Sequence, residues 1–183
     1  MIAKLKFILF VSILLASSAA AAAQKTTEKP QIKLRGKGQR IILTSVGLRR
    51  TLNVQEQISA ARLDEVNLLL VTRRQSFTYL LVNACGPSKA IPDARRCGAA
   101  EECSLLWIKL DTAWKISDIK SARYESCMES STSSDGYKIS GQKLRMEYDD
   151  FTERKHYKLS YDAEQPEQGF TLEASPLEDR ATN

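Results

Sequence analysis

Short apolar runs separated by turn-forming residues dominate this chain from residue 31 onward. In most of these runs apolar and polar residues alternate, which is the pattern of half-buried β-strands. The pattern predicts strands over residues 32–34, 40–44, 66–72, 77–82, 105–110, 114–124, 137–139, 144–148, 157–161 and 170–174. Gly, Pro, Asp or Ser residues separate several neighbouring runs, so we expect mostly local antiparallel hairpins.

One predicted strand differs from the rest because both of its faces are apolar. In Leu105–Leu110 only Lys109 interrupts the run of apolar residues. A strand that is apolar on both faces is typical of the centre of a sheet covered on both sides. We therefore place 105–110 centrally and assign Trp107, which shares a face with Leu105, to the core.

A single helix is predicted, over Val54–Leu63. Asn53 and Glu56 have the spacing of a capping box, and Val54, Ile58 and Ala61 follow at helical intervals. The chain contains no phosphate-binding loop, no G-x-G-x-x-G fingerprint and no alternation of strands with helices. The predicted fold class is mainly β: an antiparallel, hairpin-rich sandwich, barrel or curved sheet with one short helix and two disulfides.

The first 23 residues have the order of a secretory signal peptide. A cationic start with Lys4 and Lys6 precedes an apolar run from Phe7 to Leu15 and an Ala-rich end, 21–23. The alternative is an uncleaved anchor, but the apolar run is about half the roughly 20 residues a spanning helix needs. We expect export to the periplasm or outside the cell, with cleavage after Ala23 and no later transmembrane segment.

The remaining chain is predicted to form one domain. Residues 24–30 are polar and basic and are expected to be a flexible leader. A single β-rich domain is expected over 31–175 and a frayed tail over 176–183. Loss of residues 1–23 lowers the net charge from +5 to +3, which implies no nucleic-acid partner.

Four cysteines in an exported chain favour two disulfides. Cys85, Cys97, Cys103 and Cys127 lack the C-x-x-C spacing of a zinc site. We favour Cys85–Cys127 with Cys97–Cys103, because the first two follow predicted strands and the other two bracket a short flexible stretch. Sequential pairing, Cys85–Cys97 with Cys103–Cys127, remains an alternative.

Basic residues are concentrated near the start of the domain. Eight Lys and Arg residues and a single acid, Glu28, lie between residues 24 and 50. Such a stretch can be attracted to anionic envelope polymers or lipid head groups. Because it contains no aromatic residue, we favour a solvated leader and ordinary surface charge.

The densest group of candidate ligands surrounds the only histidine, His156. It comprises Glu147, Asp149, Asp150, Glu153 and His156. Strand alternation places His156 on the polar face, and no nucleophile motif such as G-x-S-x-G accompanies it. The group supports the alternative function, a small envelope hydrolase or metal-binding protein, and the favoured interpretation assigns no catalytic residue, no metal ligand and no cofactor.

Trp114 is the one residue selected as a candidate partner-binding side chain. It lies beside a predicted turn at Asp111–Ala113, where an exposed indole can anchor a partner. The sequence thus favours a non-enzymatic, exported, disulfide-stabilised β-rich module. Its partner would be a protein or another envelope component, and nothing in the sequence identifies it.

Overall fold

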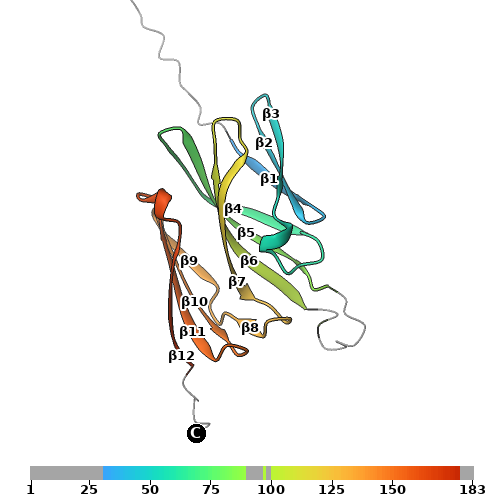
Figure 1. Cartoon of the computed structure of the whole chain (residues 1–183), viewed down its shortest axis with the longest axis vertical. Helices are drawn as coiled ribbons and strands as arrows, with labels where there is room; N and C mark the ends of the chain where they lie inside the picture. Colours follow the sequence, from blue (N-terminus) through green and yellow to red (C-terminus); the bar gives the residue numbers. More distant parts are fainter. Residues whose placement is uncertain (1–30, 90–96, 98–99, 178–183) are drawn as a thin grey trace, which may run out of the picture.

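The computed structural model describes residues 31–89, 97 and 100–177 (Figure 1). The expected signal peptide and leader, and residues 178–183 of the expected tail, lie outside the described residues. The described residues form strands and two short 3₁₀ turns, with these bounds: β1 Lys33–Lys37, β2 Arg40–Ser45, β3 Leu48–Asn53, η1 Gln55–Gln57, β4 Glu65–Arg74, β5 Phe77–Pro87, β6 Glu101–Leu110, β7 Ile116–Glu125, β8 Ser131–Thr132, β9 Tyr137–Ser140, β10 Lys143–Asp150, β11 Lys155–Asp162, η2 Pro166–Gln168 and β12 Thr171–Pro176.

Three antiparallel sheets are stacked in the order of the chain. The N-terminal sheet is β1-β2-β3, the central sheet is β4-β5-β6-β7, and the C-terminal sheet is β12-β11-β10-β8 with β9 also paired to β10. Figure 1 shows the N-terminal sheet (blue) and the C-terminal sheet (orange to red) on opposite sides of the central one (green to yellow). The mainly β, antiparallel fold class is confirmed, in its sandwich form.

Strand alternation in the central sheet builds two separate cores. In β5 and β6 the even-numbered apolar side chains, such as Leu80 and Leu106, pack with the N-terminal sheet and form the first core. The odd-numbered ones, such as Leu81 and Trp107, pack with the C-terminal sheet and form the second core. Both faces of β6 are buried, so its predicted central position is confirmed.

The predicted helix over Val54–Leu63 is wrong. Only η1 is helical, and the capping box does not form, because the Asn53 carboxamide accepts a hydrogen bond from the amide of Gln55 at 3.4 Å. The segment beyond η1 is extended: the N–H of Leu63 donates to the carbonyl of Gly38 at 2.7 Å. Apolar residues of this segment are buried in the first core, so tertiary packing overrides the helical spacing.

This extended segment passes very close to two glycines. A Cβ on Gly36 would lie 2.3 Å from the carbonyl oxygen of Leu63, and one on Gly86 would lie 1.8 Å from that of Arg62. Both positions therefore require a residue without a side chain.

The structure contains two disulfides, but the predicted pairings are both wrong. Cys85 bonds to Cys103, and Cys97 bonds to Cys127. β5 continues through Cys85 to Pro87 and β6 begins at Glu101, so the loop between them is shorter than the sequence suggested. Cys85 and Cys103 are consequently direct cross-strand neighbours, with Cα atoms 4.2 Å apart.

The first two residues of the predicted frayed tail, Pro176 and Leu177, are held by the C-terminal sheet. β12 extends to Pro176, and the N–H of Leu177 donates to the carbonyl of Arg154 at 2.9 Å. The described part of the predicted tail therefore belongs to the C-terminal sheet.

Candidate functional site

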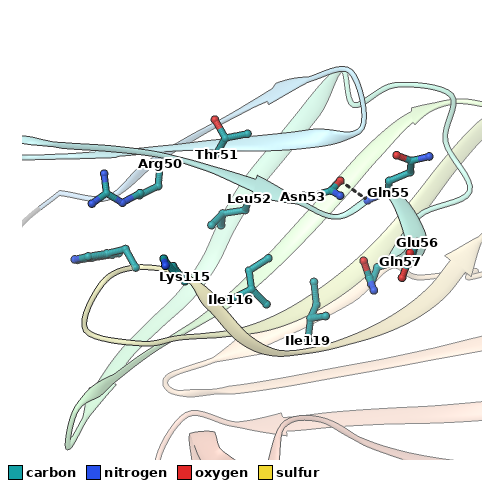
Figure 2. A pocket seen from close by; sticks show the side chains of 11 residues that line it. Arg50, Thr51, Leu52, Asn53, Gln55, Glu56, Gln57, Lys115, Ile116 and Ile119 are labelled. Atoms are coloured by element: carbon teal, nitrogen blue, oxygen red, sulfur yellow. Dashed lines mark hydrogen bonds between the residues drawn. The ribbon is translucent and has the colours of Figure 1, made fainter.

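A groove of about 410 Å³ opens where the N-terminal and central sheets diverge (Figure 2). It is lined by two stretches that lie about sixty residues apart in the chain, 50–57 and 114–119. Its lining residues are Arg50, Thr51, Leu52, Asn53, Gln55, Glu56, Gln57, Trp114, Lys115, Ile116 and Ile119.

The floor of the groove is apolar. Leu52 on β3 is buried, and in Figure 2 it points towards Ile116 and Ile119 of β7, which point back towards it. Ile116 and Ile119 are only partly buried and pack against the first core. The rim is polar, with amide side chains at Asn53, Gln55 and Gln57 along one wall. An apolar floor with hydrogen-bonding groups along its rim is the lining typical of a ligand-binding cleft.

Trp114 stands at one end of the groove in an unusual backbone conformation. Its φ is +61°, in the left-handed region that normally takes Gly or Asn. The turn is held by Asp111, whose carboxylate accepts hydrogen bonds from the amides of Ala113 (2.9 Å) and Lys115 (2.8 Å). Gly would form the same turn with less strain, so the bulky side chain makes Trp114 a candidate for a functional role.

Cationic groups surround this end of the groove. The guanidinium of Arg73 lies 5.5 Å from the ring centre of Trp114, and Arg50 Nε donates to the carbonyl of Ala113 at 3.3 Å. Lys115 adds a further exposed charge, whereas Glu56 lies along the lining contributed by η1. The groove is therefore basic at its Trp114 end and acidic near η1.

Both walls of the groove are edge strands. Among the described residues, β3 pairs only with β2, and β7 pairs only with β6 along Ile116–Ala122. Edge strands leave backbone donors and acceptors without ladder partners, and an extended segment can use them. On β7 one such group is occupied, because the N–H of Ile119 donates to the Asp118 carboxylate at 2.8 Å. β3 is therefore the more open wall.

The acidic group around His156 comes together only in part. His156 Nδ1 lies 2.7 Å from Asp149 Oδ1, and its Nε2 lies 3.4 Å from Glu147 Oε2. These side chains line an open hollow on the outer face of the C-terminal sheet. Asp150 and Glu153 are elsewhere: Asp150 accepts a hydrogen bond from the Glu153 amide, within the β10–β11 turn.

A serine completes a row of three residues with Asp149 and His156. Ser175 on β12 is the cross-strand neighbour of His156, which in turn neighbours Asp149. However, the Ser175 hydroxyl donates to the main-chain oxygen of His156 at 3.5 Å, and both imidazole nitrogens face carboxylates. The imidazole is thus not directed at the hydroxyl as a general base would be.

The same cluster lacks the geometry of a metal centre. Within the described residues, the one set of three Cys, His, Asp or Glu side chains whose ligand atoms all lie within 4.8 Å of one another is Cys85, Glu101 and Cys103. Cys85 and Cys103 are bonded to each other, so they cannot act as thiolate ligands.

Sequence reasoning overlooked a buried carboxylate at Glu102. Its side chain is 1% exposed and accepts hydrogen bonds from the hydroxyls of Ser88 and Ser126 and from the amide of Cys127. The signal was present in the strand pattern, because Glu102 shares its parity with the buried residues Leu106 and Ile108. Its contacts join β6 to the loops that follow β5 and β7, next to the Cys97–Cys127 bridge, which is a structural role.

Trp114, chosen from the sequence, lies in the groove, whereas Arg50, Leu52 and Ile119 were not singled out. Strand β3 itself was missed, because Arg49, Arg50 and Thr51 interrupt its apolar alternation. Only the return of apolar residues at Leu52 and Val54 after Gly47 could have indicated it.

No family model, curated protein or solved structure matches the chain. The fold and site therefore define its class by themselves: a three-layer antiparallel β domain with two disulfides and a groove between two sheet edges. Within the described residues, no helix has the length and apolar character needed to cross a membrane.

Proposed function

We propose that the protein is an exported binding module that takes an extended segment of a partner protein into the groove between β3 and β7. The observation that carries this proposal is the placing of Trp114 in a left-handed conformation at the end of an apolar groove. Two disulfides are compatible with the oxidising compartment in which such a module would work.

Strand addition to β3 is the binding mode that the groove favours. An added strand would hydrogen-bond to the free edge of β3 and place every second side chain towards Leu52, Ile116 and Ile119. The ring of Trp114 would hold the residue at the end of the segment. Arg50 and Lys115 favour an acidic residue there, which sets the direction of the segment.

A random peptide library displayed on phage tests the proposal. The native protein should enrich peptides with alternating apolar residues and an acidic residue at one end. Ile119→Arg should abolish their binding, because it places a charge on the groove floor. Ile139→Arg is the matched control, since Ile139 is a 42% exposed isoleucine on β9, far from the groove.

Trp114→Gly provides a second, independent variant. Gly adopts a φ of +61° without strain, and this relief offsets part of the packing that the Trp114 ring makes with the core, so the variant should fold while peptide binding is lost. If the enriched peptides bound the Ile119→Arg and Trp114→Gly variants with the same affinity as they bind the native protein, the groove would be refuted as the binding site. Enrichment of no peptide at all would contradict the proposed function.

A further inference from the structure

The outer face of the N-terminal sheet carries five cations on a regular grid. Strand pairing aligns three cross-strand rows on this face: Lys33, Thr44 and Arg49; Arg35, Ile42 and Thr51; Lys37, Arg40 and Asn53. The inward-facing residues between them, such as Ile41 and Leu43, are buried, so the grid is the solvent face. The cationic face is defined here as Lys33, Arg35, Lys37, Arg40 and Arg49, all exposed.

Among the residues that the structure describes, no acidic side chain pairs with these charges. The stretch from residue 31 to residue 53 contains neither Asp nor Glu. In the described part of the chain, none of the five cations forms an ion pair. From strand geometry, the grid covers roughly 14 Å along the strands and about 10 Å across them. Five unpaired cations in that area attract an anionic surface strongly.

The composition of the face favours an anionic lipid bilayer over a nucleic acid or a polysaccharide as its partner. The stretch 31–53 has no aromatic residue on which a nucleobase or a sugar ring could stack. At the end of the grid beside Thr44 and Arg49, the β2–β3 turn exposes Val46, whose surface is 87% accessible. An apolar tip next to cations suits the interface of a bilayer, where phosphates and acyl chains lie close together.

Charge on the opposite layer would orient the molecule at such an interface. The C-terminal sheet and its turns, residues 131–176, hold six basic and nine acidic residues. The N-terminal and C-terminal sheets lie on opposite sides of the central sheet (Figure 1). An anionic surface therefore attracts one side of the molecule and repels the other.

We infer that the cationic face docks the protein onto an anionic lipid bilayer, with lipid phosphates against the Lys and Arg side chains and Val46 entering the head-group region. The inference is independent of the proposed peptide groove, because the cations of the face point away from the core and the groove opens between the sheets.

Vesicle sedimentation tests this inference with the protein isolated after expression of the whole chain. Vesicles contain phosphatidylcholine alone, or phosphatidylcholine and phosphatidylglycerol in equal amounts. The triple variant Arg35→Gln, Arg40→Gln and Arg49→Gln should reduce partition onto the anionic vesicles by roughly 100-fold, since each basic residue near such a surface contributes a factor of about five.

A matched triple variant removes the same charge from the opposite sheet. Lys143→Gln, Arg145→Gln and Lys158→Gln change exposed residues of β10 and β11, and should leave partition nearly unchanged. Val46→Ser should weaken binding several-fold, because it removes the apolar side chain at the tip without changing the charge of the face. Vesicles of phosphatidylcholine alone report any contact that does not depend on anionic lipid.

Three outcomes would overturn the inference. The first is equal loss of partition in the two triple variants, which would make the effect one of net charge. The second is unchanged binding of Val46→Ser, which would indicate a purely electrostatic contact. The third is face-dependent binding to a soluble sulfated polysaccharide with no sedimentation on anionic vesicles, which would assign the face to a polyanion instead.

Discussion

The indole N–H of Trp107 donates a hydrogen bond to the main-chain oxygen of Pro166 at 2.8 Å. Trp107 lies in the middle of the central sheet and Pro166 begins the turn η2 that precedes the last strand of the C-terminal sheet. The bond therefore joins two layers that the strand ladders leave unconnected. Its donor is 1% exposed, so no water replaces it if it is broken.

Trp107→Ala should lower the free energy of unfolding by about 3–5 kcal/mol, because it leaves a large cavity between the central and C-terminal sheets. Trp107→Phe keeps most of the bulk and should lose about 1 kcal/mol with the hydrogen bond. Because Trp114 is only partly buried, Trp114→Ala should lower the free energy of unfolding less than Trp107→Ala does. Urea unfolding of the three variants measures the order, and an equal effect of both alanine variants would contradict it.

Glu102→Gln should destabilise the protein by roughly 1–3 kcal/mol, because the carboxamide offers one acceptor where the carboxylate offers two. The two serine hydroxyls and the Cys127 amide now share both oxygens of Glu102. Glu101→Gln is the control: the neighbouring side chain is exposed, and its change should stay within about 0.5 kcal/mol. Thermal unfolding of both variants decides, and equal midpoints would contradict the buried network.

The disulfide pairing can be read directly from peptide masses. Cleavage at Lys and Arg separates Cys85 from Cys97, and cleavage at Glu separates Cys97 from Cys103. Non-reduced digests made with both specificities should link the Cys85 peptide to the Cys103 peptide and the Cys97 peptide to the Cys127 peptide. A Cys97–Cys103 peptide would restore the pairing expected from the sequence.

Loss of the Cys97–Cys127 bridge should also lower stability. The bridge closes a loop of 30 residues, for which the chain-entropy estimate is about 3–4 kcal/mol. The paired change Cys97→Ala and Cys127→Ala, measured by denaturant unfolding without reductant, checks this value. A change below about 1 kcal/mol would show that the Glu102 contacts hold the same loops without the bridge.

Alkaline pH should destabilise the fold through its buried phenols. Burial is the main cause that raises the pKa of Tyr161 to about 12 and the pKa values of Tyr124 and Tyr148 further. The pKa of these phenols is higher in the folded state than in the unfolded state. Their contribution to the free energy of unfolding is therefore complete below the unfolded-state pKa of about 10, and it is lost as the pH rises through the folded-state pKa.

The free energy of unfolding should therefore fall steadily above about pH 10. Phenolate absorbance follows the titration, and Tyr161→Phe should flatten the fall because it removes one of the groups that cause it. Titration of all six tyrosines near pH 10 in the folded protein would contradict the burial of these side chains.

Local patterns predicted the parts of this fold that local physics determines. Tyr157, Leu159 and Tyr161 lie together towards the second core, as alternation requires, and the apolar run at 105–110 is the buried central strand. The stretch 54–63 failed because its helical spacing competes with burial between two sheets. Disulfide pairing failed because it depends on register, and Cys85 meets Cys103 only once β5 and β6 are known to be long.

The candidate groove could not have been predicted as a site. Its two walls come from residues 50–57 and 114–119, and no sequence pattern indicates that these stretches face each other. Trp114 was recognisable because it lies beside a predicted turn, where an exposed indole can anchor a partner. The cationic face was visible as a run of basic residues, but strand pairing was needed to show that five of them share one surface.

The central sheet, apolar on both sides, makes the order of synthesis matter. Each outer sheet has only the central sheet to pack against, so the apolar face of β1–β3 stays uncovered until β4–β7 have been synthesised. The central sheet in turn exposes Trp107 and its neighbours until the C-terminal sheet, in about the last fifty residues, has been synthesised. A chain interrupted after β7 would present a bare hydrophobic face and associate with its own copies. The protein is therefore expected to be sensitive to premature termination after β7.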